Sequence, residues 1–333
     1  MNTQNRTEPT EIDVLEHSPE QRPVIDEVME GLRAETPYFP PKLHYDQRGS
    51  ELFEEICTLD EYYLTRTELS IMREHAASIA SALGERCVLI EPGSGASTKT
   101  RLLLSALHDP AAYVPVEISR DFLVDVAERI ASDFEDLEVL PVWADFTRSH
   151  PVPKATADDA ADAGPGRRAV YFPGSTIGNF PRDAAEDLLG KFAKMVGPGG
   201  SVVVGVDLEK DVARMEAAYN DDRGVTDAFN KNMLTNINAL TGSDFDEDLW
   251  TFRAAWDEAV GAIVSHVTAT DDHDVSIGGE VFSFRRGDRV QTEQSHKYRR
   301  GDFRALAGRA GLDEAGAWTD AAGDFAVVHL VAR

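Results

Sequence analysis

A short apolar run that ends in an acid and a glycine turn constrains the fold of this chain more than any other feature. Residues 88–90 are Val-Leu-Ile, Glu91 follows them, and glycines stand at positions 93 and 95. Ser97 and Thr98 then precede an amphipathic segment, 100–107, which has the pattern of a capped helix. A strand, a glycine turn and a helix in this order are typical of nucleotide-like ligand sites at the carboxyl end of a parallel sheet.

The spacing of the glycines limits which ligand this turn would hold. A dinucleotide fingerprint carries a third glycine three residues after the second, and Thr98 stands there instead. An acid before the glycines suits a cationic ligand without phosphates, because Glu91 could neutralise it directly or through a water. S-adenosylmethionine, with a sulfonium and an ammonium, is such a ligand. A tight strand-to-helix connection without any ligand is the alternative for this stretch alone.

The composition is that of a globular and strongly acidic chain. In its 333 residues, 33 Lys and Arg stand against 59 Asp and Glu, which gives a net charge of −26. Such a surface repels phosphates, so neither nucleic acid nor a membrane is expected as a partner. No apolar run approaches the ~18 residues of a membrane span, and two cysteines predict reduced thiols in a cytoplasmic protein. The acidity fits an ordinary cytosolic protein or one from a salty habitat.

Strand and helix patterns alternate through the central section of the chain. Expected strands lie at 88–90, 113–118, 138–142, 169–172 and 201–206, with helices at 121–134 and 183–195. Five strands with helices between them predict an α/β fold with a doubly wound, Rossmann-like parallel sheet. Before this section we expect a mobile tail over 1–22 and helices at 24–32, 50–56 and 67–83, and within it an exposed loop at 154–167.

After Asp207 the pattern changes to that of a second unit. Helices are expected at 212–219 and 225–240, and strands at 262–269, 275–284 and 290–298. A helix at 302–310 and a strand at 325–331 close the chain and would return it to the large sheet.

Carboxylates follow three successive strands of the predicted sheet. They are Glu91, Glu117 and Asp145, and Phe146 comes directly after the last. Because ligands sit beyond the carboxyl ends of such strands, Glu117 could bind both ribose hydroxyls and Asp145 could accept from an adenine amino group under Phe146. Each acid alone is more often a helix cap or a solvated loop residue. Together they favour an S-adenosylmethionine site.

Specific sequence blocks between about Pro40 and Arg333 form a set. They are Tyr45-Asp46, Glu61-Tyr62-Tyr63-Leu64-Thr65-Arg66-Thr67-Glu68, Gly93-Ser94-Gly95 with Lys99-Thr100-Arg101, Gly174-Ser175-Thr176-Ile177-Gly178-Asn179, Tyr219-Asn220-Asp221 with Gly224-Val225-Thr226 and Phe229-Asn230, and Thr292-Glu293-Gln294-Ser295. The set resembles the histidine Nα-methyltransferases of ergothioneine biosynthesis. That resemblance implies a class I methyltransferase that transfers three methyl groups from S-adenosylmethionine to the α-amino nitrogen of histidine, which yields hercynine.

The resemblance also implies roles for individual residues. The cofactor would be held by Gly93, Lys99, Glu117, Asp145 and Phe146. The substrate would be held by Tyr62, Gly174, Asn179 and Tyr219 at its amino and carboxylate end and by Glu293 and Ser295 at its imidazole, with Tyr45 and Tyr62 as the catalytic residues near the amine.

Four residues depart from the family pattern, and an expected methionine is absent. Pro92 and Ala96 alter the first glycine turn, Leu64 replaces a usual proline, and Glu117 stands where relatives often have Asp. The strand near Ile263 carries no methionine of the kind that lines the pocket in histidine-specific relatives, which puts the pocket wall in doubt.

Two of the polar residues have a physical reason to recognise imidazole. Glu293 and Ser295 are two residues apart, so on a strand they face the same way. An acid and a hydroxyl can bond both ring nitrogens of histidine, whereas tryptophan or phenylalanine would leave the acid buried and unpaired. A solvent-facing polar strand explains the same pattern about equally well, because 290–298 alternates poorly.

The predicted division places a substrate-binding α+β domain at 23–66 and 210–296 and the methyltransferase domain at 67–209 and 297–333. We expect a monomer, a small-molecule amino-acid substrate and no metal site, since neither the histidines nor the cysteines have ligand spacing. Three rivals stay open at this point: an N-methyltransferase for tryptophan or another indole, a nicotinamide oxidoreductase, and a non-catalytic binding protein.

Overall fold

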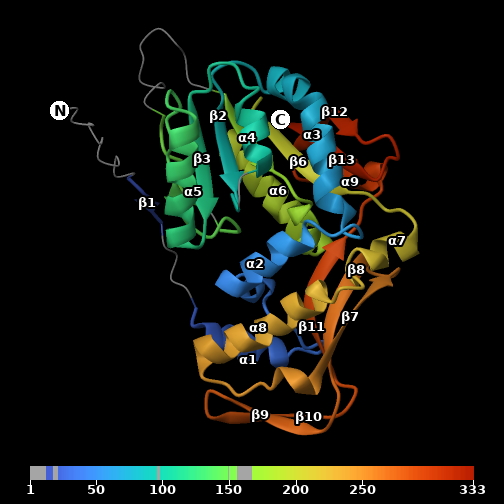
Figure 1. Ribbon diagram of the computed structural model, residues 1–333. Coiled ribbons are helices and arrows are strands. Elements are labelled where there is room, and N and C mark those ends of the chain that lie inside the picture. Colours follow the sequence, from blue (N-terminus) through green and yellow to red (C-terminus); the bar gives the residue numbers. More distant parts are fainter. Residues whose placement is uncertain (1–12, 18–21, 96–97, 149, 156–166) are drawn as a thin grey trace, which may run out of the picture.

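A large mixed sheet forms the upper part of the molecule (Figure 1). The computed structural model describes residues 13–17, 22–95, 98–148, 150–155 and 167–333. In spatial order the strands are β1 (Leu15–Glu16), β4 (Val142–Trp143), β3 (Ala112–Glu117), β2 (Val88–Pro92), β5 (Arg168–Phe172), β6 (Ser201–Asp207), β13 (Phe325–Ala332) and β12 (Leu312–Thr319). The strands from β1 to β6 run parallel, with Ile90 level with Val114 and Val170, and β13 and β12 add an antiparallel edge.

Helices cover both faces of this sheet because its strands are apolar on both faces. Val88 and Ile90 pack in one core with α6 (Arg182–Val196) and α9 (Arg300–Arg309), whereas Leu89 points the other way. The opposite core is formed with α3 (Tyr63–Leu83), α4 (Thr98–Leu104) and α5 (Arg120–Asp133). The predicted doubly wound α/β sheet is therefore confirmed, and the antiparallel edge is an addition to it.

A smaller antiparallel sheet lies below the large one (Figure 1). Its order is β11 (Arg289–His296), β8 (Ala262–Ala269) and β7 (Trp250–Asp257), with a separate hairpin of β9 (His273–Ile277) and β10 (Glu280–Phe284). The accompanying helices are α1 (Val24–Leu32), α2 (Gln47–Ile56), α7 (Val212–Ala217) and α8 (Val225–Thr241), with short 3₁₀ turns η1 (Pro41–His44), η3 (Thr176–Asn179) and η4 (Glu247–Leu249).

The hydrophobic cores of the two sheets are separate. The two clusters that flank the large sheet draw on residues 71–208 and 298–332. The two clusters under the small sheet draw on residues 28–64 and 215–290. The helix α3 joins the two parts, because Tyr63 and Leu64 at its start lie in a lower core and Ile71 lies in an upper one.

Several predicted elements have different bounds in the structure. The expected strand 275–284 is two strands, because Gly278 and Gly279 both adopt positive φ (60° and 83°) and turn the chain into a hairpin. The expected strand 138–142 shrinks to Val142–Trp143, since Pro141 has no N–H to continue the ladder.

Two predicted segments need separate mention. Within the predicted tail 1–22, Leu15 and Glu16 pair with Val142 and Trp143 at the edge of the large sheet, so this part is ordered against expectation. Residues 1–12 and 18–21 of the predicted tail lie outside the described residues, as do residues 156–166 of the predicted loop 154–167.

Candidate active site

The turn after β2 has the backbone that its glycines predict. Gly93 has φ 68° and its N–H donates to the Val116 carbonyl at 2.8 Å. A Cβ atom on Gly93 would lie 3.2 Å from the Phe146 ring, so a side chain there would crowd that ring. The structure thus brings together two predicted cofactor residues, Gly93 and Phe146. The predicted Ser97 cap of the following helix lies outside the described residues.

Glu91, the acid before this turn, is engaged by the protein. Its carboxylate is buried and accepts hydrogen bonds from the Thr100 hydroxyl at 2.6 Å and the Tyr113 phenol at 2.5 Å. Burial raises the pKa of Glu91 to about 7, against the effect of these two donors. Both oxygens are therefore used to fix α4 against β3, and the idea that Glu91 neutralises a ligand loses its support.

Glu117 and Asp145 stand where the next two parallel strands end. One Glu117 oxygen accepts from the Ile118 N–H at 2.8 Å, and burial raises the pKa of this acid. One Asp145 oxygen accepts from the Thr147 N–H at 2.9 Å and its hydroxyl at 2.6 Å. The other Asp145 oxygen lies 3.6 Å from the Arg148 Nε, and the Gly95 backbone also bonds Glu117, so each acid is oriented by several protein groups.

A buried carboxylate that the sequence analysis did not single out links Lys99 to Gly174. Glu68 on α3 is 1% exposed, forms an ion pair with Lys99 and accepts the Gly174 N–H at 2.9 Å. The strand β6 leaves room for it, because a Cβ atom on Gly205 would come within 2.2 Å of a Glu68 oxygen. Lys99 is therefore held at the turn after β5.

The turn after β5 is held in an uncommon conformation. Gly174 has φ 81° and Ser175, which is not glycine, has φ 56°. The Ser175 hydroxyl accepts the Asp207 N–H at 2.9 Å, which ties the turn to the end of β6. The half-buried Asn179 amide, at the end of η3, makes no hydrogen bond to any described residue.

The predicted substrate residues Tyr62, Tyr219 and Ser295 lie together. The Tyr62 and Tyr219 rings meet edge to face with centroids 6.1 Å apart. The Tyr219 and Ser295 hydroxyls are hydrogen-bonded at 2.7 Å. Tyr45 is 49% exposed, and its ring packs against Phe53 and Phe229 with centroids 5.8 Å away. These aromatic rings form one wall of the site.

Glu293 is the one acid of the predicted site without a hydrogen bond to a described residue. Burial raises the pKa of its carboxyl to about 7, and the nearby Lys297 lowers it only in part. Desolvation is the main cause that raises the pKa values of Tyr45 and Tyr62, and the negative charge of Glu293 raises both further. The charge of Glu117 also raises the pKa of Tyr45. Tyr45 therefore lies within electrostatic reach of both the cofactor edge and Glu293.

The strand β8 lies beside Glu293 in the small sheet. Register pairs Glu293 with Ser265 and Ser295 with Ile263, and a bulge lies between Gln291 and Glu293. The strand carries no methionine, as the sequence indicates, and Ser265 is 2% exposed. The residue directly across from the acid is thus small and polar.

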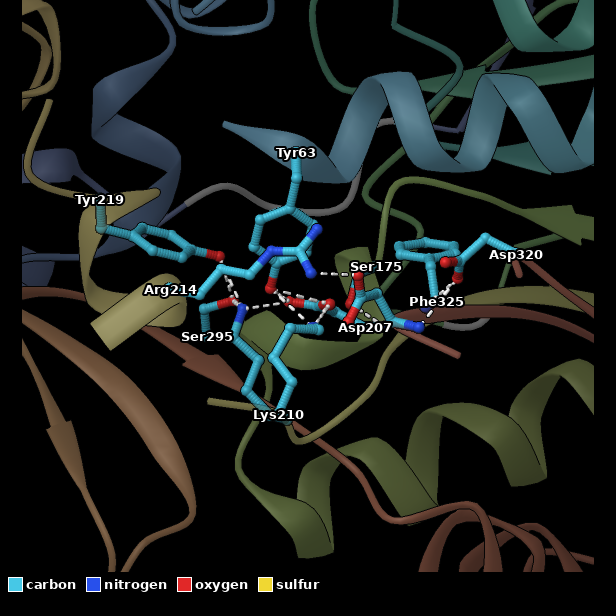
Figure 2. A network of polar contacts seen from close by, with 11 residues as sticks. Tyr63, Ser175, Asp207, Lys210, Arg214, Tyr219, Ser295, Asp320 and Phe325 are labelled. Carbon is cyan, nitrogen blue, oxygen red and sulfur yellow. Dashed lines mark hydrogen bonds and ion pairs between the residues drawn. The ribbon is translucent and has the colours of Figure 1, made fainter. Parts of the chain in front are cut away.

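Sequence reasoning missed the buried ion pair of Asp207 and Lys297, at 2.8 Å. Asp207 lies at the centre of the polar network in Figure 2, with Tyr63, Ser175 and Lys210 around it and Tyr219 and Ser295 to one side. Desolvation lowers the pKa of Lys297, but Asp207 and Tyr219 outweigh desolvation, so the pKa of Lys297 is raised. The rule that found Glu117 would have found Asp207, because Asp207 also ends a parallel strand.

Two general searches of the described residues complete the picture. No group of three or more His, Cys, Asp or Glu side chains in the described ranges could hold a metal ion. Over those same ranges, the helices are too short or too polar for any of them to cross a membrane.

A Rossmann-like sheet with acids at its carboxyl edge, beside a cluster of tyrosines and a carboxylate without a described partner, is the arrangement of a class I methyltransferase. Residues 24–332 match the family model of histidine-specific, S-adenosylmethionine-dependent methyltransferases, and the chain belongs to this family.

Named relatives agree with the family. The histidine N-alpha-methyltransferases of Mycolicibacterium smegmatis and Mycobacterium tuberculosis are each 37% identical to this chain, over 90% of it and 92% of the relative. Ergothioneine biosynthesis protein 1 of Neurospora crassa is 33% identical over 88% of this chain, which spans 33% of that longer protein. The predicted family and methyl donor are therefore confirmed.

Proposed function

We propose that this enzyme transfers three methyl groups from S-adenosylmethionine to the α-amino nitrogen of L-histidine and so forms hercynine for ergothioneine biosynthesis. The observation that carries this substrate is the half-buried Glu293 carboxylate, which stands two residues from Ser295, has its pKa raised by desolvation and accepts no hydrogen bond from a described residue. A desolvated acid without a donor is costly unless a ligand supplies one. The N–H of an imidazole is such a donor, and a benzyl side chain offers none.

The cofactor would lie along the carboxyl edge of the large sheet. There we assign Gly93 and Phe146 to the adenosine, Glu117 to the ribose and Asp145 to the adenine amino group. In Asp145 one oxygen is held by Thr147 and the other lies 3.6 Å from the Arg148 Nε, so a ligand donor would share this carboxylate with Arg148. Lys99 acts through its ion pair with Glu68, which positions the turn at Gly174 between the cofactor and the substrate.

The substrate would lie between this edge and the small sheet. We assign Tyr62, Asn179 and Tyr219 to the amino and carboxylate end, together with the backbone at Gly174, and Glu293 and Ser295 to the imidazole. Support comes from the Asn179 amide, which makes no hydrogen bond to a described residue, and from the contact of the Tyr62 and Tyr219 rings. Neutral acceptors of this kind tolerate the loss of every N–H as three methyl groups are added.

The reaction is an in-line displacement in which the new N–C bond forms as the C–S bond breaks, and the sulfur keeps the electron pair. Positive charge moves from sulfur to nitrogen, so alignment of the amine supplies most of the rate. We assign that alignment to Tyr45 and Tyr62, which would also pass the amine proton to water. The partial exposure of Tyr45 gives that proton a path to solvent.

The two separate sets of hydrophobic cores support the division into a substrate-binding part, 23–66 and 210–296, and a methyltransferase part, 67–209 and 297–333. We propose that the substrate is bound where these parts meet. A monomeric state and a cytoplasmic location belong to the same proposal and rest on the sequence alone; sedimentation velocity tests the first.

Mass spectrometry of histidine incubated with the enzyme and S-adenosylmethionine tests the substrate. We expect the mono-, di- and trimethylated products to appear in turn, and no product from tryptophan or tyrosine. Methylation of tryptophan but not histidine would favour the indole alternative. Fragmentation that places a methyl group on the ring would contradict the assignment of Glu293 and Ser295 to the imidazole.

A further inference from the structure

Lys297 is a fully buried lysine whose three protons are all committed. It directly follows β11, on the same face as Glu293 and Ser295, and is 0% exposed. Its Nζ lies 2.8 Å from Asp207 Oδ2, 2.8 Å from the Tyr219 phenol oxygen and 2.9 Å from the Ser295 hydroxyl oxygen. An ammonium group carries three donors and no acceptor, so Lys297 must donate to both hydroxyls.

Asp207 binds this lysine where two chain segments lie side by side, the one that follows β6 and the one that follows β11. The Tyr298 N–H donates to the Asp207 carbonyl at 3.1 Å, and the Glu209 N–H donates to the Tyr298 carbonyl at 3.0 Å. Tyr63 and Lys210 also donate to the Asp207 carboxylate, at 2.8 Å and 2.5 Å. The anchor under Lys297 is therefore fixed from several sides (Figure 2).

A count of hydroxyl protons shows what this arrangement does to the pocket. Tyr219 and Ser295 have one proton each, and one of the two is used in the 2.7 Å bond between them. Lys297 fills a lone pair on both oxygens, so one hydroxyl proton is left to point elsewhere. The phenol is the more acidic of the two hydroxyls and therefore the stronger donor, so we assign the bond as Tyr219 donating to Ser295. Both acceptor positions of Ser295 are then filled, and its own proton must be donated outward.

We propose that Lys297, anchored by Asp207, is a positioning residue that converts the hydroxyl of Ser295 from an adaptable group into a fixed donor for the imidazole. This inference rests on the proposed function. Neutral imidazole has one N–H, which Glu293 accepts, and one bare nitrogen, which needs the donor that Ser295 presents. An indole has no bare nitrogen, so Lys297 adds to the discrimination against tryptophan, because the outward proton would be left unpaired.

Lys210 supplies a matched control for this role. It is a lysine bound to the same Asp207 carboxylate, but its other hydrogen bond goes to Tyr63, and it does not contact Tyr219 or Ser295. Lys297→Met and Lys210→Met therefore remove the same charge from the same acid. Only the first releases the two hydroxyls.

The test measures kcat and KM for histidine together with the Kd for S-adenosylmethionine. We expect Lys297→Met to raise the histidine KM about 10- to 100-fold, the cost of charged hydrogen bonds, with the cofactor Kd changed less than about twofold. Lys210→Met should change the histidine KM by less than about threefold. Equal effects of the two substitutions on the histidine KM would overturn the proposal.

A double-mutant cycle shows whether Lys297 acts through Ser295. In a Ser295→Ala background, Lys297→Met should raise the histidine KM by only about threefold more, because the two side chains work as one unit. Fully additive effects would contradict the proposal. If Lys297→Met alone does not bind the cofactor, Asp207→Asn with Lys297→Met removes both charges and repeats the measurement. Wild-type enzyme that fails to methylate histidine would instead refute the proposed function.

Discussion

The two sides of the candidate site treat their acids in opposite ways. At the edge of the large sheet, Glu91, Glu117, Asp145 and Glu68 all accept hydrogen bonds from nearby protein groups. On the small sheet, Glu293 accepts none from a described residue, although desolvation raises its pKa to about 7. The first side is thus built for a fixed shape, and the second has an acceptor that the proposed function assigns to the imidazole.

This difference separates stability from specificity. An acid that accepts hydrogen bonds from the protein stabilises the fold, so its removal lowers the free energy of unfolding of the free enzyme. An acid without a protein donor destabilises the fold, and its removal weakens binding of the ligand. The predictions below test that separation one acid at a time.

The largest effect is expected at Glu68. Glu68→Ala leaves the Lys99 ammonium and the Gly174 N–H without their acceptor, and we expect a loss of about 3 kcal/mol in the free energy of unfolding. Urea denaturation measures it. Glu74→Ala on the same helix α3 is the control, because the Glu74 side chain is 75% exposed and should cost less than about 0.5 kcal/mol. Equal losses would show that the cofactor edge is not held by its buried acid.

Glu293→Gln should have the next largest effect, and on the substrate alone. The amide keeps the shape but loses the charge that accepts the imidazole N–H, so the histidine KM should rise about 30-fold, or about 2 kcal/mol. Steady-state kinetics measure it, and the Kd for S-adenosylmethionine should stay unchanged. Glu258→Gln, on the exposed turn between β7 and β8, is the control. A histidine KM equal to that of wild type would remove Glu293 from the imidazole site.

The same variant should gain stability, with a defined pH dependence. The pKa of Glu293 is about 7 in the folded protein and near 4.5 when unfolded, so its stabilising contribution is complete below pH 4.5 and is lost as the pH rises through 7. The Glu293→Gln variant does not lose stability in this pH range, because its amide does not ionise. At pH 8 it should exceed wild type by about 1–2 kcal/mol in the free energy of unfolding, since part of the shift is screened by solvent. At pH 4.5 the two should agree.

Urea denaturation at the two pH values measures this difference. Glu91, whose pKa is also raised to about 7, is present in both proteins and cancels. Parallel pH profiles for wild type and variant would show that Glu293 is already satisfied in the free enzyme.

Much of the fold and of the cofactor edge could be predicted from the sequence, because both depend on local patterns. The helix at 24–32 and the strand at 262–269 have the predicted bounds, and the acids at strand ends follow from one rule of sheet topology. The strands β7 and β12 were missed. β12 is polar and contains Gly316, where its pairing with β13 shifts register, so the local pattern is weak.

The pocket side was harder to predict because its partners come from distant parts of the chain. The role of Lys297 depends on its contacts with Asp207 and Tyr219, which lie in other elements. No local pattern connects these three residues. The roles assigned to individual site residues stay predictions, whereas the family, the fold class and the methyl donor are confirmed.

The smallest effect is expected at Glu117, and it completes the comparison on the cofactor side. The backbone at Ile118, Ser119 and Gly95 already bonds this acid, so Glu117→Gln mainly removes the charge from its proposed contact to the ribose. We expect the Kd for S-adenosylmethionine to rise about fivefold, or about 1 kcal/mol, with the histidine KM at saturating cofactor unchanged. Isothermal titration calorimetry measures it against Glu128→Gln, on the exposed face of α5. A rise in the histidine KM instead of the cofactor Kd would place Glu117 on the substrate side and would contradict the separation of the two sides.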